Sequence, residues 1–206
     1  MTRHCVSDPI HSQPDERAGR IAAYFRESVR IKLLAADACG PAIIAAADLL
    51  VESFRGGGKL LLCGNGGSAA DCQHVAAEFV SLLRQDRPRA ALPAIALTTD
   101  TSFLTARAND FGFDEVFSRQ VEALGRPGDV LMGISTSGNS RNVIHAVRTA
   151  REQGVRTIGL LGEGGALTEL VDAAVVIPST NTQHVQEAML AVEHILCELT
   201  ESHLFG

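Results

Sequence analysis

Short apolar segments alternate with helix-like segments from residue 59 onward, and this alternation limits the possible folds more than any other feature. The apolar segments that read as strands are 59–63, 94–98, 129–134, 156–161 and 174–177. The segments whose spacing predicts helices are 69–84, 113–124, 140–153, 166–171 and 182–203. Strands that alternate with helices build a parallel sheet, and right-handed crossovers place helices on both of its faces. We therefore expect an α/β fold with a doubly wound, five-stranded parallel sheet.

Two helices are expected ahead of this core. Residues 16–37 carry apolar side chains at helical spacing, namely Ile21, Phe25, Val29 and Leu33. The Gly-Pro pair that follows breaks the pattern, and Pro41 suits the first turn of a second helix that ends near residue 54. Residues 1–15 lack the apolar centre of a signal peptide. We expect a flexible tail at 1–15 and a single domain at 16–206 that includes this N-terminal helical pair.

The composition narrows the functional classes. The formal net charge is −6 and the 18 basic residues are scattered, which argues against a nucleic-acid-binding surface. No apolar run approaches the roughly 20 residues of a membrane span. The chain has 5 cysteines without a CxxC pair, and Cys63 and Cys197 lie in apolar runs, which favours buried thiols in a reducing compartment. We therefore expect a cytoplasmic protein whose ligand is neither a nucleic acid nor a membrane.

The segment STSGNS directly follows the third expected strand. It offers hydroxyls from Ser135, Thr136, Ser137 and Ser140, and its glycine lets the backbone turn tightly. A helix is expected to begin near Ser140, with the positive end of its dipole facing the loop. Hydroxyls, free N–H groups and a helix N-terminus together form a phosphate site without lysine or arginine. An ordinary serine N-cap is the alternative, although a cap needs only one hydroxyl.

The segment GNGGSAAD follows the first expected strand in the same way. Ala69 stands where the dinucleotide motif G-x-G-x-x-G needs its last glycine, and no suitable Walker lysine follows, so a nucleotide site is disfavoured. The loop is either a strand-to-helix turn that needs a positive φ at Gly66 or Gly67, or a contact for sugar hydroxyls or phosphate through Asn65 and Ser68. Both loops lie at the carboxyl ends of expected parallel strands, where ligands bind in such folds.

Polar residues also recur on two of the expected helices. His74 and Glu78 are four residues apart and share one helix face among alanine, valine and phenylalanine. Such a pair can bind a divalent metal or transfer protons, and a His–Glu hydrogen bond on a solvated face is the alternative. On the last helix, Gln186 and His194 can face one cleft. Spacing alone favours a partly exposed amphipathic helix there.

Two further points concern polar residues with less pattern around them. Asn109 and Asp110 fall just before an expected helix, so Asp110 is either a capping residue or an acceptor for substrate hydroxyls. On the last helix, Glu187 and Glu193 are interpreted as surface charges.

The segments CGNGGSAADCQHVAAEF, ANDFGFDEVFSRQVEALGRPGDVLMGISTSGNSRNVI and VQEAMLAVEHILCEL together resemble the phosphoheptose isomerases, which are sugar isomerase (SIS) domain proteins. The resemblance covers about residues 16–203. It implies a flavodoxin-like three-layer sandwich of SIS type. It also implies conversion of sedoheptulose 7-phosphate to D-glycero-D-manno-heptose 7-phosphate through an enediol, the first step of ADP- or GDP-heptose biosynthesis. STSGNS alone is typical of the wider SIS class, and the combination of segments is more specific.

The resemblance further implies roles for individual residues. One zinc ion per subunit would be held by His74, Glu78, Gln186 and His194. Glu78 and His194 would also be the catalytic acid–base groups. The substrate would contact Asn65, Gly66, Gly67, Ser68, Glu78, Asn109, Asp110, Ser135, Thr136, Ser137, Ser140 and Gln186. Family members are usually homotetramers with active sites at subunit interfaces, so a homotetramer is expected here.

The sequence departs from the family pattern at two positions of the last helix. His184 stands where members often have arginine, and Met189 stands where they often have histidine. These changes could alter which sugar phosphate the protein prefers, so the sequence does not decide its exact substrate. A non-catalytic SIS adaptor that binds the bacterial replication initiator is the alternative function, since LPAIALTTDTSFLTA and the terminal LF resemble that branch. That branch lacks counterparts of Glu78 and His194, and both are present here, which favours the isomerase.

Overall fold

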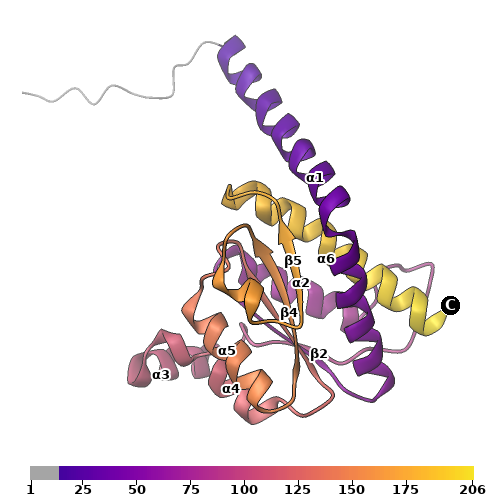
Figure 1. Cartoon of the computed structure of the whole chain (residues 1–206), viewed down its shortest axis with the longest axis vertical. Helices are drawn as coiled ribbons and strands as arrows, with labels where there is room; N and C mark the ends of the chain where they lie inside the picture. The colour runs from indigo at the N-terminus through magenta and orange to yellow at the C-terminus, as the bar shows by residue number, and fades with distance from the viewer. Residues whose placement is uncertain (1–13) are drawn as a thin grey trace, which may run out of the picture.

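Five parallel strands form one sheet in the computed structural model, which describes residues 14–206 (Figure 1). The strands are β1 (Leu60–Gly64), β2 (Ala94–Ala96), β3 (Val130–Ser135), β4 (Arg156–Gly162) and β5 (Ala173–Ile177). Their order is β2-β1-β3-β4-β5, so the direction of winding reverses between β1 and β3. The expected doubly wound, five-stranded sheet is confirmed. Of the expected tail, residues 1–13 lie outside the described residues.

Helices cover both faces of the sheet and complete a three-layer sandwich (Figure 1). One face carries α1 (Pro14–Arg55), α2 (Gly67–Val80) and α6 (Thr182–Phe205); the other carries α4 (Ser118–Leu124) and α5 (Arg141–Glu152). Successive strand residues point to opposite faces, and β1 follows this rule. Leu60 and Leu62 pack with α1, α2 and α6, whereas Leu61 and Cys63 pack with α4 and α5.

The expected N-terminal helical pair is in fact one continuous helix, α1, of 42 residues. Pro41 lies inside it and lacks the N–H that would bond to the carbonyl of Asp37. Both residues are exposed, so water can serve that carbonyl, while Cys39 and Ile43 on the opposite side pack into the core. The core contact therefore carries the helix through the proline. The N-terminal part of α1 extends well beyond the sandwich (Figure 1).

One helix among the described residues is long and apolar enough to cross a membrane, namely Glu16–Arg55 of α1, with a mean hydropathy of 1.7 in its most apolar window. The sequence had suggested no such run. Length and composition do not by themselves indicate a membrane-spanning helix, because helices in the core of a protein satisfy the same test. The C-terminal half of α1 is such a helix, since residues from Ile31 to Leu50 pack against the sheet and α6.

The segment between β2 and β3 differs most from expectation. The helix expected at 113–124 is a short 3-10 turn, η1 (Phe113–Glu115), followed by α4. A further helix, α3 (Thr101–Phe111), was not expected. None of its residues is buried, so it has no apolar face for a sequence pattern to reveal. Its N-cap was the available signal, because Asp100 accepts a hydrogen bond from the N–H of Phe103 at 2.9 Å. The last 3-10 turn, η2 (Ala166–Glu169), follows β4.

Candidate active site

The two glycine- and serine-rich loops lie side by side at the carboxyl ends of the central strands. β1 and β3 are neighbours, with Gly64 paired to Ile134, so the loops that follow them start together. Two side chains join the loops reciprocally. Asn65 donates to Asn142 at 2.8 Å, and Asn142 donates to Asn65 at 2.9 Å. This amide pair ties the first loop to the first turn of α5, and it occupies the side chain of Asn65.

The serine loop gathers its hydroxyls around the N-terminus of α5. The Oγ of Ser135 lies 3.0 Å from that of Ser140 and 3.5 Å from that of Ser137. Ser140 is the N-cap residue of α5, but its side chain makes no capping hydrogen bond. The ordinary serine N-cap therefore does not explain this loop. Gly138 has a φ of 62° and lies against Gly165, where a Cβ would come within 2.6 Å of backbone.

The first loop is covered by a side chain from α6. A Cβ on Gly67 would lie 2.5 Å from the Oε1 of Gln186 and 2.8 Å from its Cδ, so only glycine leaves room for this amide. The Nε2 of Gln186 donates to the Oδ2 of Asp71 at 2.9 Å. Burial raises the pKa of Asp71, and the hydrogen bond from Gln186 opposes part of that rise. The positive φ expected at one of the two glycines belongs to Gly66, at 57°.

Polar side chains from α2 and α6 meet midway along the two helices. The Nε2 atoms of His74 and His194 lie 2.8 Å apart, and the Nε2 of His74 lies 3.8 Å from the Oε1 of Glu78. The side chains of His74 and Glu78 are 40% and 20% exposed, so the cluster is accessible from one side. The solvated His–Glu hydrogen bond within α2 is not formed at 3.8 Å. His74 pairs with α6 instead.

Three of the four residues expected to bind zinc therefore come together. The fourth, Gln186, is held by Asp71, which precedes His74 by one turn on α2. As they stand, the side chains of residues 14–206 form no group of three or more His, Cys, Asp or Glu that could hold a metal ion. Two imidazole nitrogens on a tetrahedral zinc, each at about 2.0–2.1 Å, would be about 3.3 Å apart. The observed distance between the two Nε2 atoms is 2.8 Å, so a small side-chain movement would bring them to the separation that zinc requires.

Asn109 and Asp110 do not join either loop. They lie inside α3, near its C-terminal end, so their expected position before a helix is wrong. Both are exposed, and the Nδ2 of Asn109 donates to the Oδ1 of Asp110 at 2.8 Å. Asp110 is not a capping residue, because α3 begins at Thr101 with Asp100 as its cap.

The interpretation of Glu187 and Glu193 as surface charges is wrong for Glu193 and incomplete for Glu187. Glu193 is fully buried, and neither of its carboxylate oxygens has a hydrogen-bond partner in the part of the chain that the structure describes. Burial, with the charge of Asp71, raises the pKa of Glu193 to about 8. Glu187 accepts hydrogen bonds from Tyr24 at 2.8 Å and Ser28 at 2.5 Å, both on α1.

The two departures from the family pattern lie in packed positions. His184 is buried, with its ring centroid 4.4 Å from that of Tyr24 and its Nδ1 3.4 Å from Glu187. Met189 is fully buried in the core between α6 and the sheet. Sequence reasoning missed Asp71 and Asn142. A signal for each was present, because Asp71 is an acidic residue within an apolar helix and Asn142 follows the serine loop directly.

Fold and loops together define a domain of the SIS class, and the SIS domain model matches residues 23–162. The phosphoheptose isomerase of Roseiflexus sp. (strain RS-1) is 56% identical over 197 residues, which are 95% of this chain and 99% of that protein. The chain belongs to the phosphoheptose isomerase family of SIS-domain proteins. Among solved structures, the phosphoheptose isomerase from Neisseria gonorrhoeae is similar, with a TM-score of 0.84 and 46% identity over 90% of this chain and 98% of that one. The one from Francisella tularensis has a TM-score of 0.85 and 38% identity, with the same coverage.

Proposed function

We propose that this chain is an aldose–ketose isomerase that converts sedoheptulose 7-phosphate to D-glycero-D-manno-heptose 7-phosphate, at the start of heptose-nucleotide biosynthesis in the cytoplasm. The observation that carries the proposal is the meeting of His74 and Glu78 on α2 with His194 on α6. It occurs in a chain 56% identical to a phosphoheptose isomerase. The adaptor alternative gains no support from the comparisons, and the adaptor branch lacks counterparts of Glu78 and His194.

The serine loop is proposed to hold the phosphate. Ser135, Thr136, Ser137 and Ser140 place hydroxyls at the N-terminus of α5, where the helix dipole favours an anion. Binding the phosphate there orients the sugar, so the reacting carbons arrive at the acid–base groups in one geometry. The backbone of Gly66, Gly67 and Ser68, with Asn65, would contact the hydroxyls of the sugar chain beside it.

Glu78 is proposed to remove a proton from C1 of the ketose, which gives the enediol, and the proton is then delivered to C2. His194 exchanges the accompanying proton between O1 and O2. The two electrons stay within the substrate, so no redox cofactor is required. Asn109, Asp110 and Gln186 stay proposed substrate contacts by resemblance, and within one chain α3 packs mainly against η1.

A zinc ion fits the chemistry of this cluster, because imidazole nitrogen and carboxylate oxygen are its usual ligands. His74, His194 and Glu78 would hold it, and Gln186 would join them by leaving Asp71. When bound, zinc would polarise the carbonyl and stabilise the negative charge of the enediolate.

The dimensions of α2 support an active site shared between copies of the chain. Ser68 and Glu78 are ten residues apart on this helix, so they are separated by about 15 Å along its axis. A fully extended heptose phosphate spans only about 10 Å from phosphorus to C1, at roughly 1.2 Å per bond. A substrate whose phosphate lies beside Ser68 of one chain would therefore reach the Glu78 of a neighbouring chain more readily than the Glu78 of its own chain.

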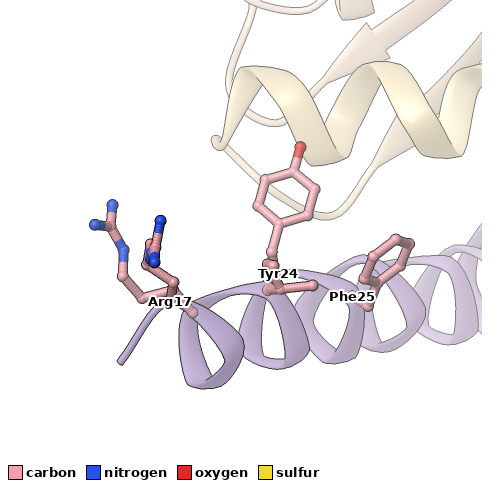
Figure 2. A pocket seen from close by; sticks show the side chains of 5 residues that line it. Arg17, Tyr24 and Phe25 are labelled. Atoms are coloured by element: carbon pink, nitrogen blue, oxygen red, sulfur yellow. The ribbon is translucent and has the colours of Figure 1, made fainter. Parts of the chain in front are cut away.

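The projecting part of α1 offers the surface for that assembly. Its exposed apolar residues recur every four positions and form one stripe, namely Ile21, Phe25, Val29 and Leu33. Arg17, Tyr24 and Phe25 line a shallow hollow of about 500 Å³ on this helix. Figure 2 shows these side chains, with Arg17 nearest the N-terminal end of α1. This hollow lies on α1, far from the strand ends, so it is better suited to a neighbouring helix than to the sugar. We propose that further copies of the chain cover it in a homotetramer.

Turnover of sedoheptulose 7-phosphate by the purified chain, with and without chelator and added zinc, tests the proposal. Glu78→Gln should abolish turnover and leave binding of the sugar phosphate intact, whereas Glu152→Gln, at an exposed position of α5, should change neither. Retained turnover in Glu78→Gln would refute the role of Glu78. Light scattering of Phe25→Asp should give a smaller species than the unchanged chain, with turnover lost on dissociation.

A further inference from the structure

Arg89 lies between α2 and β2 and is almost completely buried, with 2% of its side chain exposed. Its Nη1 donates to the backbone oxygens of Phe79 and Ala90, each at 2.9 Å. Its Nη2 donates to the backbone oxygen of Glu78 at 2.8 Å and to the Oε1 of Glu201 on α6 at 2.5 Å. One buried guanidinium group thus joins the last turn of α2 to α6.

The contacts to α2 fall where that helix needs donors. α2 ends at Val80, so its last carbonyls have no N–H partner within the helix. The N–H of Ser81 bonds to Ala77, Arg89 supplies the donor for Glu78, and Arg89 shares the carbonyl of Phe79 with the N–H of Leu92. A positive charge at this end also opposes the negative end of the helix dipole. Arg89 therefore fixes the last turn of α2, including the backbone of Glu78 itself.

The contact to α6 extends this constraint to the second helix. Glu201 follows His194 by seven residues, which is about two turns, so both lie on the same face of α6. The Oε1 of Glu201 also accepts a hydrogen bond from the N–H of Leu83, just beyond α2, at 3.2 Å. The carboxylate therefore receives two donors from the segment that follows α2. A change in this contact shifts the Glu78 turn relative to His194.

We propose that Arg89 is a positioning residue for the isomerisation, an inference that rests on the proposed function. It holds the backbone of Glu78 against α6, so that the Glu78 carboxylate stays beside His74 and His194. It touches neither the serine loop nor the glycine loop, so substrate binding does not depend on it. Displacement of a reacting group by about 1 Å can lower a rate by about 100-fold, which makes this contact matter to turnover.

The test compares Arg89→Lys and Arg89→Ala with a matched control in the full-length protein. The control is Asp129→Asn, which disturbs another buried charge: Asp129 accepts from the N–H groups of Lys59 and Arg126, each at 2.9 Å, at the opposite end of β3. The readouts are kcat and KM for sedoheptulose 7-phosphate, thermal stability, and hydrogen exchange of the amides at 76–80.

We expect kcat to fall by about 10- to 100-fold in both Arg89 variants. KM should change by less than about twofold, because the phosphate loop is intact. A sub-denaturing concentration of guanidinium should restore part of kcat in Arg89→Ala, and exchange at 76–80 should accelerate. Asp129→Asn should lose stability and keep its kcat and its exchange at 76–80.

An unchanged kcat in folded Arg89→Ala would overturn the proposal, as would an equal loss of kcat in Asp129→Asn. If Arg89→Ala does not fold, Arg89→Lys decides, because a single ammonium group cannot replace the two-sided contacts of the guanidinium. If the unchanged chain itself shows no turnover, the proposed function fails. The hydrogen exchange then still tests the contact, and identical exchange at 76–80 in Arg89→Lys and the unchanged chain overturns it.

Discussion

Glu193→Gln should make the protein more stable at pH 8 and leave its stability near pH 5 almost unchanged. The carboxyl group of Glu193 is fully buried without a hydrogen-bond partner among the described residues, and its pKa is raised from 4.5 to about 8. Below pH 4.5 it is protonated in both folded and unfolded chains, so it contributes no pH dependence. Between pH 4.5 and 8 the unfolded chain releases this proton and the folded chain keeps it. Stability therefore falls as pH rises.

The size of this loss of stability follows from the difference between the two pKa values of Glu193, 4.5 in the unfolded chain and about 8 in the folded chain. The free energy of unfolding changes by about 1.4 kcal/mol for each pH unit, so the loss reaches about 5 kcal/mol by pH 8 and grows no further above it. Glutamine has nearly the same shape and cannot ionise. At low pH, glutamine at this position lowers the free energy of unfolding about as much as the protonated acid does, because both side chains bury polar atoms without partners. The variant should lack the decline with pH.

Urea unfolding at pH 5, 6, 7 and 8 measures this difference. Chain concentration and metal content must be equal in both proteins, because assembly and metal binding also shift stability. Glu152→Gln, on exposed α5 surface, is the control and should follow the unchanged protein at every pH. The reasoning is refuted if the advantage of Glu193→Gln at pH 8 exceeds that at pH 5 by less than about 1 kcal/mol.

Two further predictions concern packing. Gly67→Ala should push the Gln186 amide off Asp71 and lower the free energy of unfolding by about 1–3 kcal/mol, because a buried acceptor loses its donor. Gly19→Ala is the control, because a Cβ there meets nothing within 4 Å. Equal melting temperatures of Gly67→Ala and the unchanged protein would contradict the clash. Burial raises the pKa of Cys63 to about 12, so its thiol should react slowly with alkylating reagents. Alkylation at pH 8 followed by peptide mapping should leave Cys63 unlabelled until urea is added. Rapid labelling of Cys63 in the native protein would show that β1 opens.

The elements that the sequence predicted well are those with a repeating pattern. The five strands are largely apolar runs, and the structure places each within one residue of its expected bounds, apart from β2, which ends two residues early. Each loop was identifiable because its glycines and serines follow a strand directly. α3 could not be predicted from periodicity, since all of its residues lie at least partly exposed. The break expected at Pro41 was wrong because local propensity yielded to the contacts of Cys39 and Ile43 with the core.

From spacing alone, without the family resemblance, side-chain partners could be predicted only where both members lie on one element. His74 and Glu78 were identifiable as a pair from their spacing, but the pairing of His74 with His194 joins residues 120 positions apart. The same limit explains Glu193. Spacing on α6 cannot show that the adjoining surface of α2 is close enough to bury it, and helix propensity is the same for a buried and an exposed glutamate.

The contact between α2 and α6 carries polar groups at three levels. Gln186 meets Asp71 near the start of both helices, His194 meets His74 midway, and Glu201 meets Arg89 near the end. Buried apolar residues lie between these levels, together with the buried carboxyl group of Glu193. The alternative to this arrangement is a shift of one helix past the other by a turn. Such a shift would break all three polar contacts together and leave the buried groups among them, such as the Arg89 guanidinium, without partners, at a cost of about 1–3 kcal/mol for each buried group. The polar levels therefore fix the relative position of the two helices, and with it the distance between Glu78 and His194 on which the proposed proton transfer depends.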